Sequence, residues 1–184
     1  SNTIKIILPK NIKKGRSLIR VYVANKYGRG NDLLIPLHDG KIITNTNNLQ
    51  RTDFHNQIMY FLMVDRFLDG DISNTKKLSN DSVNYKSDYF GGDLQGVINK
   101  INNNYFTNLG INTIWLSPIT QNPEGAFGLW KNPLTKFSAY HGYWPISNTK
   151  IDYRFGDDRT FKELITKAHD KNINVILDYV ANHV

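Results

Sequence analysis

Short apolar runs alternate with amphipathic segments after residue 55, and this alternation constrains the fold more than any other feature. Residues 58–64, 113–116 and 175–177 are almost wholly apolar and have the length of strands. Segments with apolar residues at helical spacing begin at Leu94 and near Thr160. Apolar strands that alternate with amphipathic helices are typical of a parallel sheet covered on both faces. The sequence therefore predicts an α/β fold.

The spacing also predicts where two helices begin and end. We expect one helix over residues 94–109, ended by Gly110 in the left-handed conformation that glycine adopts without strain. A second helix is expected to begin with a capping box formed by Thr160 and Glu163. The returns from helix to strand, at residues 110–112 and 170–174, are short.

The loops that lead from strand to helix are long, and long loops within a compact domain are usually functional. They cover residues 65–93 and 117–159. In a (β/α)8 barrel these loops build the active-site face, and a doubly wound sheet also binds its ligand at the carboxyl ends of its strands. The alternation alone does not separate the two architectures.

Residues 1–45 form a separate β-rich segment. Its apolar runs at residues 4–8, 18–23 and 33–37 are punctuated by Pro9 and several glycines, which predicts a few antiparallel strands. Such a pattern is consistent with the remnant of a β-sandwich domain that precedes a second domain at residues 56–184. Its core is thin, so we expect the segment to depend on its neighbour for stability.

Composition excludes several classes of function. The chain has 184 residues and no cysteine, which excludes disulfides, thiol catalysis and zinc–thiolate sites. No apolar run approaches the ~20 residues needed to span a bilayer. The net charge of +7 has no nucleic-acid motif beside it, so we interpret it as a solvated basic face and expect no nucleic-acid partner. No signal peptide is visible at Ser1, so this end does not indicate where the protein resides.

Oxygen-bearing side chains gather in the first long loop. Aspartates recur over residues 65–71 around the turn-permitting Gly70, and Gly91-Gly92-Asp93 follows. Because Ca²⁺ takes roughly 6–8 oxygen ligands, this loop is a candidate calcium site. It is not an EF-hand, since Asn74 and Asn80 stand where that motif needs glycine and glutamate. The alternative is a polar loop of Asx turns, with Asp93 only capping the following helix.

Aromatic and imidazole groups gather in the second long loop and after the third strand. Residues 140–144 read Tyr-His-Gly-Tyr-Trp, which suits the apolar face and directional hydroxyls of a pyranose. Ordinary core aromatics at a strand edge explain the same residues equally well. Residues 178–183 read Asp-Tyr-Val-Ala-Asn-His, and burying such groups without partners is costly. Asn182 and His183 are adjacent, so they can serve two different sites.

Asp65 and Asp178 each follow a predicted strand. Both are therefore expected at the same face of the predicted fold. Retaining glycoside hydrolysis needs two carboxyl groups ~5–5.5 Å apart, and nothing in the sequence fixes the distance between Asp65 and Asp178. Aspartates that orient neighbouring groups are the favoured interpretation. The sequence contains no serine–histidine–aspartate signature, dinucleotide fingerprint or phosphate loop.

Five motifs, taken in order, resemble the α-amylase family of glycoside hydrolases. They lie at residues 58–67, 91–96, 110–118, 140–144 and 178–183. The most similar branches are the neopullulanases, the cyclomaltodextrinases and the starch-utilisation α-amylases. The resemblance covers residues 56–184 and implies the first part, about three strands, of a TIM (β/α)8 barrel.

The resemblance also assigns roles to the clustered residues. It implies that Tyr143 stacks on the sugar at the cleavage subsite, while His141 and His183 hydrogen-bond the sugar hydroxyls. Trp144 would support this wall, and Asp178 matches a supporting aspartate and not the nucleophile. The residues that match calcium ligands of the family are Asp69, Asp71, Asn74, Thr75, the Gly91 carbonyl, Asp93 and, at a different calcium, Asn182. Thr75 departs from the asparagine that is usual at its position.

The resemblance further implies the chemistry of the whole enzyme. The family's nucleophile Asp, acid/base Glu and transition-state Asp follow the fourth, fifth and seventh strands, and none of them is in this chain. The whole enzyme would cleave α-1,4-glucosidic bonds of starch or maltooligosaccharides with retention, and this chain alone is expected to be inactive.

Two alternatives stay open at this point, and two further expectations follow. The chain could instead be a non-catalytic glucan-binding module, or belong to a barrel with transferase or isomerase chemistry. Strands with unpaired edges at residues 58–64 and 175–177 predict self-association. The family resemblance favours a periplasmic, cell-surface or secreted location.

Overall fold

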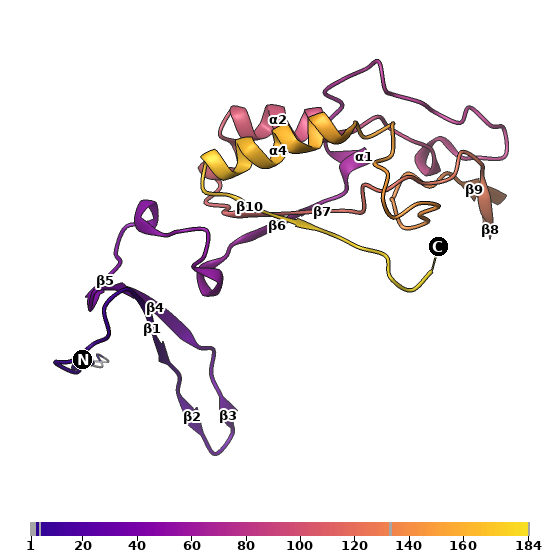
Figure 1. The fold of residues 1–184 in the computed structure, drawn as a ribbon. Helices are drawn as coiled ribbons and strands as arrows, with labels where there is room; N and C mark the ends of the chain where they lie inside the picture. Colours follow the sequence, from indigo (N-terminus) through magenta and orange to yellow (C-terminus); the bar gives the residue numbers. More distant parts are fainter. Residues whose placement is uncertain (1–2, 4, 133, 184) are drawn as a thin grey trace. The chain divides into compact units, whose positions relative to one another are not determined.

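Three parallel strands form the sheet of the second part of the chain (Figure 1). In the computed structural model, which describes residues 3, 5–132 and 134–183, these strands are β6 (Met59–Leu62), β7 (Thr113–Leu116) and β10 (Asn174–Leu177). β7 lies in the middle and pairs with both neighbours in parallel. Each strand coincides with a predicted apolar run, so the predicted parallel sheet is confirmed.

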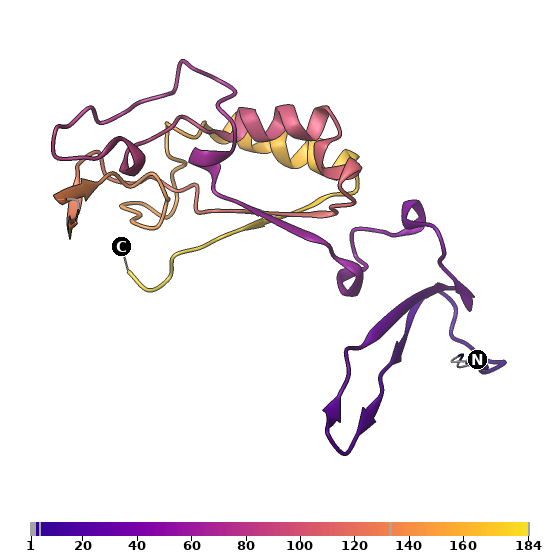
Figure 2. The same cartoon turned by 180° about the vertical axis from the view of Figure 1, so that it is seen from behind.

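Both long helices lie on the same face of this sheet, as the two opposite views show (Figures 1 and 2). They are α2 (Leu94–Asn102) and α4 (Asp158–Asp170). The prediction that helices cover both faces is wrong for the described residues, because successive crossovers of one hand place their helices on one side. The other face carries Phe61, Trp115 and Ile176, which are neighbours across the strands and are exposed.

Sequential strands with their helices on one face are the arrangement of neighbouring units in a (β/α)8 barrel. One half of a doubly wound sheet has the same arrangement, so the strands alone do not separate the two architectures. In the described part of the chain, β6 and β10 are the edge strands of this sheet. Self-association through these edges stays a prediction.

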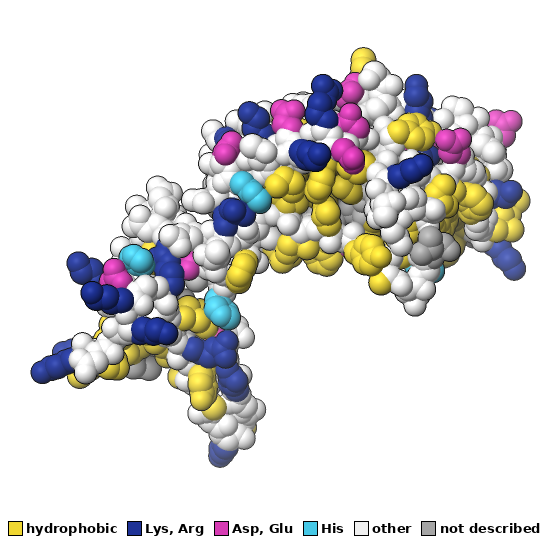
Figure 3. Space-filling view, viewed as in Figure 1, with side chains coloured by type: hydrophobic (Ala, Val, Ile, Leu, Met, Phe, Trp, Pro, Cys, Tyr) yellow, Lys and Arg dark blue, Asp and Glu magenta, His cyan; other side chains and the backbone are white. Residues whose placement is uncertain are grey.

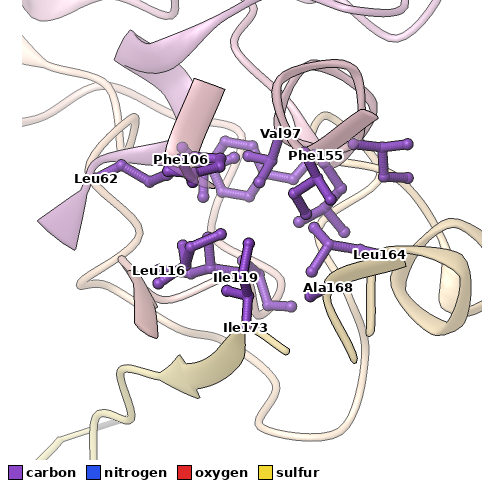
Figure 4. Close-up of a cluster of buried hydrophobic side chains, with 14 of the residues drawn as sticks. Leu62, Val97, Phe106, Leu116, Ile119, Phe155, Leu164, Ala168 and Ile173 are labelled. Atoms are coloured by element: carbon purple, nitrogen blue, oxygen red, sulfur yellow. The ribbon is translucent and has the colours of Figure 1, made fainter. Parts of the chain in front are cut away.

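Buried apolar side chains fill the space between the sheet and the helices (Figure 4). Leu116 from β7, Val97 from α2 and Leu164 from α4 are fully buried. Phe106 joins them from the short helix α3 (Tyr105–Asn108). Because sheet and helices share this core, it fixes the strand ends from which the long loops leave.

The helix expected over residues 94–109 is broken in two. α2 ends at Asn102, and α3 begins after Asn104, whose φ is 64°. Asparagine enters this left-handed region more readily than most residues, so the chain can turn there. Gly110 has φ 73°, which confirms the predicted left-handed end of the segment.

The predicted capping box at Thr160 is wrong, because α4 begins two residues earlier. Asp157 is the N-cap, and its Oδ1 accepts hydrogen bonds from the Thr160 amide and the Thr160 hydroxyl, both at 2.7 Å. Thr160 therefore donates to the cap instead of forming it. Aspartate and threonine are both favourable N-cap residues. The sequence has Asp157 and Thr160 close together, so the residue type alone does not show which of them is the cap.

The N-terminal unit spans Ser1–Gln57, and the sheet with its helices belongs to a second unit, Ile58–Val184. In the first unit β1 (Arg16–Val21) pairs antiparallel with β4 (Leu33–His38), which pairs with β5 (Lys41–Ile42). β2 (Ala24–Asn25) and β3 (Gly28–Arg29) form a small hairpin, and the 3₁₀ turns η1 (Thr46–Asn48) and η2 (Phe54–Asn56) follow β5.

The core of the N-terminal unit is thin. Among its described residues, Leu37 is the one buried apolar side chain. The strand predicted at residues 4–8 is absent at residues 5–8, and Ile4 lies outside the described residues. The β-sandwich remnant stays a prediction.

The two long loops of the second unit carry short elements of their own. α1 (Val64–Phe67) and the 3₁₀ turn η3 (Tyr85–Ser87) follow β6, and the hairpin of β8 (Phe127–Lys131) and β9 (Leu134–Phe137) follows β7. These elements lie at the carboxyl ends of the parallel strands (Figure 1). Among the described residues, no helix has the length and apolarity that crossing a membrane requires.

Candidate functional site

A hydrogen bond between two side chains joins the loop after β7 to the segment after β10. The Tyr143 hydroxyl donates to Oδ2 of Asp178 at 2.7 Å. His183 lies beside them, with its Nε2 2.9 Å from the carbonyl oxygen of Tyr143. Since a carbonyl only accepts, His183 donates from Nε2. The structure therefore brings Tyr143, Asp178 and His183 together, although 35 residues separate Tyr143 from Asp178.

His141 and Trp144 complete an aromatic wall around Tyr143. The His141 and Tyr143 rings are stacked with centroids 5.9 Å apart, and the Trp144 ring meets His141 edge to face at 4.6 Å. The Tyr143 amide donates to Nδ1 of His141 at 2.9 Å. Burial lowers the pKa of His141, so its ring is neutral with the proton on Nε2. His141 thus presents one N–H donor.

The Tyr143 hydroxyl is held as a neutral donor. Burial and the hydrogen bond to the Asp178 carboxylate raise the pKa of Tyr143 to about 12. The phenol therefore stays protonated at any physiological pH, and its bond to Asp178 fixes the tilt of the ring. Tyr143 can act as a platform for an apolar surface and not as an acid.

Asn122 is a positioning residue that was not predicted from the sequence. Its Oδ1 accepts from the Trp144 amide at 2.9 Å, and its Nδ2 donates to the carbonyl oxygens of Thr120 at 2.7 Å and Gly142 at 3.2 Å. Asn122 is fully buried. Its partner Gly142 lies 20 residues further along the chain, so no local pattern reveals it.

A buried ion pair supports Asn122 from behind. Oδ2 of Asp152 accepts from the Asn122 amide at 2.9 Å and lies 2.6 Å from Nη2 of Arg154. Gly142 has φ 83°, and a Cβ there would stand 2.2 Å from the carbonyl oxygen of Pro118. Only glycine fits such an approach. The turn that carries the aromatic wall can therefore adopt this backbone conformation only with glycine at position 142.

Asp65 is directed at the far end of its own loop and not at the aromatic wall. Its carboxylate accepts from the Phe90 amide at 3.0 Å and from the Gly91 amide at 3.2 Å. Burial raises the pKa of Asp65 to about 6, although these bonds and Arg66 oppose the shift. The Arg66 guanidinium lies between the rings of Phe90, at 3.9 Å, and Tyr140, at 3.8 Å. Asp65 thus joins the two ends of the first long loop, and Arg66 connects this loop to the second one.

Asp93 organises the candidate calcium loop. Its Oδ1 accepts from the Gly70 and Gly96 amides at 3.1 and 2.6 Å, and its Oδ2 accepts from the Asp71 amide at 2.8 Å. Oδ2 also accepts from Nδ2 of Asn74 at 3.2 Å. Asp93 is fully buried and is the N-cap of α2. The bond from the Gly96 amide is the capping role that the alternative interpretation expects, and the other three bonds hold the loop.

Four residues beside Asp93 leave oxygen atoms in one small region. Oδ1 of Asp69 and Oδ1 of Asn74 are buried without a hydrogen-bond partner. The Thr75 hydroxyl donates to Oδ2 of Asp69 at 2.8 Å, and a Cβ on Gly91 would meet both residues within 2.8 Å. Orphaned buried oxygens are rare and call for an explanation, which a bound cation would give.

The side chains of two further predicted ligands, Asp71 and Asn182, have other partners. Oδ1 of Asp71 is turned to Ser73, whose hydroxyl and amide donate to it and lower the pKa of Asp71. Asn182 has its contact with His183, at 3.5 Å between Nδ2 and Nδ1. Among the described residues, no group of three or more His, Cys, Asp or Glu side chains could hold a metal. A cation in the loop would therefore need amide, hydroxyl and carbonyl oxygens in addition to the carboxylate of Asp69.

Comparison with known proteins identifies the family. Residues 61–184 match the family model described as alpha amylase, catalytic domain. The chain belongs to the α-amylase family. It is 39% identical over 139 residues to a cyclomaltodextrin glucanotransferase of Geobacillus stearothermophilus, a match that covers 74% of this chain and 19% of that protein. An α-amylase of Niallia circulans is 38% identical over 144 residues, covering 76% and 26%.

Solved structures of α-amylase family members share the fold of the second unit. Gamma-CGTase from alkalophilic Bacillus clarkii matches with a TM-score of 0.59 and 36% identity, over 70% of this chain and 18% of that one. The α-amylase of Geobacillus thermoleovorans, solved in complex with acarbose, has a TM-score of 0.51 and 36% identity, over 69% and 24%. The chain spans about a fifth to a quarter of the length of these relatives. The sheet is consistent with part of the family's TIM barrel.

Proposed function

We propose that this member of the α-amylase family is the N-terminal part of the catalytic barrel of an α-glucan-active enzyme and forms one wall of its sugar cleft. The observation that carries the proposal is the convergence of His141, Tyr143 and His183 beyond the strand ends. The relatives support the substrate class, since they are named cyclomaltodextrin glucanotransferase and α-amylase, and one related structure holds acarbose.

In this proposal each side chain of the wall has one task. The ring of Tyr143 stacks on the apolar face of a glucose unit, and Trp144 supports it from the side. His141 donates from Nε2 to a sugar hydroxyl, and His183 binds a second hydroxyl. Asp178 is a positioning residue, since its carboxylate accepts the Tyr143 hydroxyl and so holds the platform.

The bond-breaking groups would come from the later strands of the barrel. A carboxylate nucleophile attacks the anomeric carbon while a carboxylic acid protonates the departing glycosidic oxygen, which gives a covalent glycosyl-enzyme. Water then completes hydrolysis, or a glucan hydroxyl completes transfer, with retention in both cases. The glucanotransferases among the relatives favour transfer as the second candidate activity. The neopullulanase branch stays a prediction.

The chain alone is expected to bind maltooligosaccharides weakly and to cleave none of them. With one wall of the cleft, its affinity for maltotriose should be in the millimolar range, roughly −4 kcal/mol. NMR titration should shift the resonances of His141 and Tyr143, and a reducing-sugar assay should remain at background.

Two outcomes would contradict this proposal in different ways. Micromolar binding that Tyr143→Ala abolishes, without cleavage, would favour a non-catalytic glucan-binding module. Release of reducing sugar by the purified chain would mean that it contains its own carboxylate pair, and Asp65→Asn and Asp178→Asn would then identify it.

We also propose that the loop after β6 binds Ca²⁺. The two orphaned oxygens, on Asp69 and Asn74, support this proposal together with the adjacent Thr75 and the Gly91 carbonyl. The bound ion would hold the first long loop against the start of α2, with Asp93 as the organiser and Asp71 as a further ligand. Asn182 is proposed as a ligand of a separate calcium ion.

Calcium is expected to raise the melting temperature of the chain. At a calcium concentration of 100 times Kd the stabilisation is about 2.7 kcal/mol, which corresponds to a rise of roughly 5–10 °C for a chain of this size. Differential scanning fluorimetry with calcium and with EDTA measures it. Asp69→Asn should abolish the rise, and Asp81→Asn, an exposed site in the same loop, should preserve it. Equal melting temperatures with and without calcium would contradict the proposal.

A further inference from the structure

A second hollow lies beside the aromatic wall. It is bounded by η3 on one side and by the β8–β9 hairpin on the other, and its volume is about 580 Å³. Pockets that bind small molecules usually have roughly 300–1,000 Å³, so one or two sugar units fit here.

Exposed aromatic side chains line this hollow. Trp130 is 61% exposed and Tyr85 is 70% exposed, and Phe137 also lines the hollow. Figure 3 shows hydrophobic side chains gathered on the surface at the end where β8 and β9 lie. Contiguous exposed apolar groups of this kind mark binding sites more often than ordinary surface.

The walls of the hollow are tied to each other by hydrogen bonds. The Asn84 amide donates to the Thr135 hydroxyl at 2.7 Å, and the Asn84 side chain accepts from the Lys86 amide at 3.0 Å, which fixes η3. The Trp130 indole donates to the carbonyl oxygen of Asn132 at 2.8 Å, which orients its ring. A site that is already ordered loses little entropy when a ligand binds.

Both walls are also attached to the loop that carries the aromatic wall. Phe127, at the start of the hairpin, meets the Trp144 ring edge to face at 6.0 Å. On the other side Arg66 donates to the carbonyl oxygen of Lys86 at 3.0 Å and stacks on Tyr140 at 3.8 Å. The two sides of the hollow are therefore each connected by side-chain contacts to the loop that carries the aromatic wall.

We infer that this hollow is a second binding site for an α-glucan chain, remote from the bond that is cleaved. Trp130 and Tyr85 stack on glucose rings, and Asn84 and Lys86 hydrogen-bond their hydroxyls. The mixture of flat apolar rings, amide and ammonium groups fits a pyranose better than a purely apolar or a charged ligand. The inference rests on the proposed function and adds to it a preference for long chains over short ones.

Affinity electrophoresis of the chain in gels that contain soluble starch tests this inference. Trp130→Ala and Tyr85→Ala should each weaken the apparent affinity for starch about tenfold, as is common when a central aromatic anchor is removed. Leu129→Ala is the matched control, because Leu129 is 59% exposed on the same strand and does not line the hollow. It should migrate as the wild type does, and circular dichroism confirms that each variant is folded.

A parallel NMR titration with maltotriose separates this inference from the proposed function. Loss of starch retardation in Trp130→Ala, with the maltotriose shifts at His141 retained, supports the second site. Unchanged retardation overturns it and leaves the proposed function in place. If neither starch nor maltotriose interacts with the wild type, both are overturned. A change in oligomeric state with unchanged retardation means that a second copy covers Trp130, which also overturns the inference.

Discussion

Asp93→Ala is expected to unfold the second unit or leave it barely stable. The substitution removes the acceptor for three backbone amides and for the Asn74 side chain, all of which converge on one buried carboxylate. Each buried donor left without a partner costs roughly 1–3 kcal/mol, so we expect a loss of about 4 kcal/mol. This is a large part of the 5–15 kcal/mol, approximately, that stabilises an ordinary domain.

Chemical denaturation followed by far-UV circular dichroism measures this loss. Asp93→Asn keeps one acceptor oxygen and should cost about half as much. Asp81→Ala, at an exposed position of the same loop, should stay within about 0.5 kcal/mol of the wild type. A loss below about 1 kcal/mol for Asp93→Ala would mean that water or the loop itself satisfies these donors.

Gly96→Ala is expected to destabilise the chain by about 3 kcal/mol, although alanine ordinarily stabilises the interior of a helix by roughly 1 kcal/mol relative to glycine. Gly96 lies in the first turn of α2, and a Cβ there would stand 1.9 Å from the carbonyl oxygen of Leu68. That oxygen also accepts from the Asp93 amide at 3.1 Å, so moving it disturbs the cap of the helix.

The neighbouring position provides the control for this prediction. Gln95→Ala shortens a side chain to the same methyl group one residue earlier on the helix and should leave the melting temperature within about 2 °C of the wild type. Thermal unfolding of both variants under one condition gives the comparison. A melting temperature of Gly96→Ala equal to or above that of the wild type would show that the loop at Leu68 moves aside without cost.

The sheet was predictable from the sequence because its strands are short and apolar, a pattern that little else produces. The break at Asn104 was not, because apolar residues such as Ile101 and Tyr105 keep their helical spacing on either side of one left-handed residue. The β8–β9 hairpin was missed for a different reason. β8 is exposed along its whole length, and the buried residue of β9 is the polar Thr135, so the hairpin shows no alternation of apolar and polar residues.

The aromatic wall was predictable only in part. His141, Tyr143 and Trp144 are nearly adjacent in sequence, and the chemistry of their side chains is enough to suggest a sugar ligand. Nothing in the sequence pairs Tyr143 with Asp178 or places Asn122 under Trp144, because these contacts depend on how distant loops fold together. The residues that would touch a ligand were therefore easier to find than the residues that hold them.

The hydrogen bond from Tyr143 to Asp178 has a consequence for the order in which the protein matures during synthesis. A ribosome translates Asp178 well after Tyr143, and until the third strand has emerged and docked the phenol lacks its acceptor. Domains begin to fold while the chain is still growing. The Tyr143 ring therefore acquires its final tilt late, and in a nascent chain that ends before Asp178 the hydrogen bond that fixes this tilt cannot form.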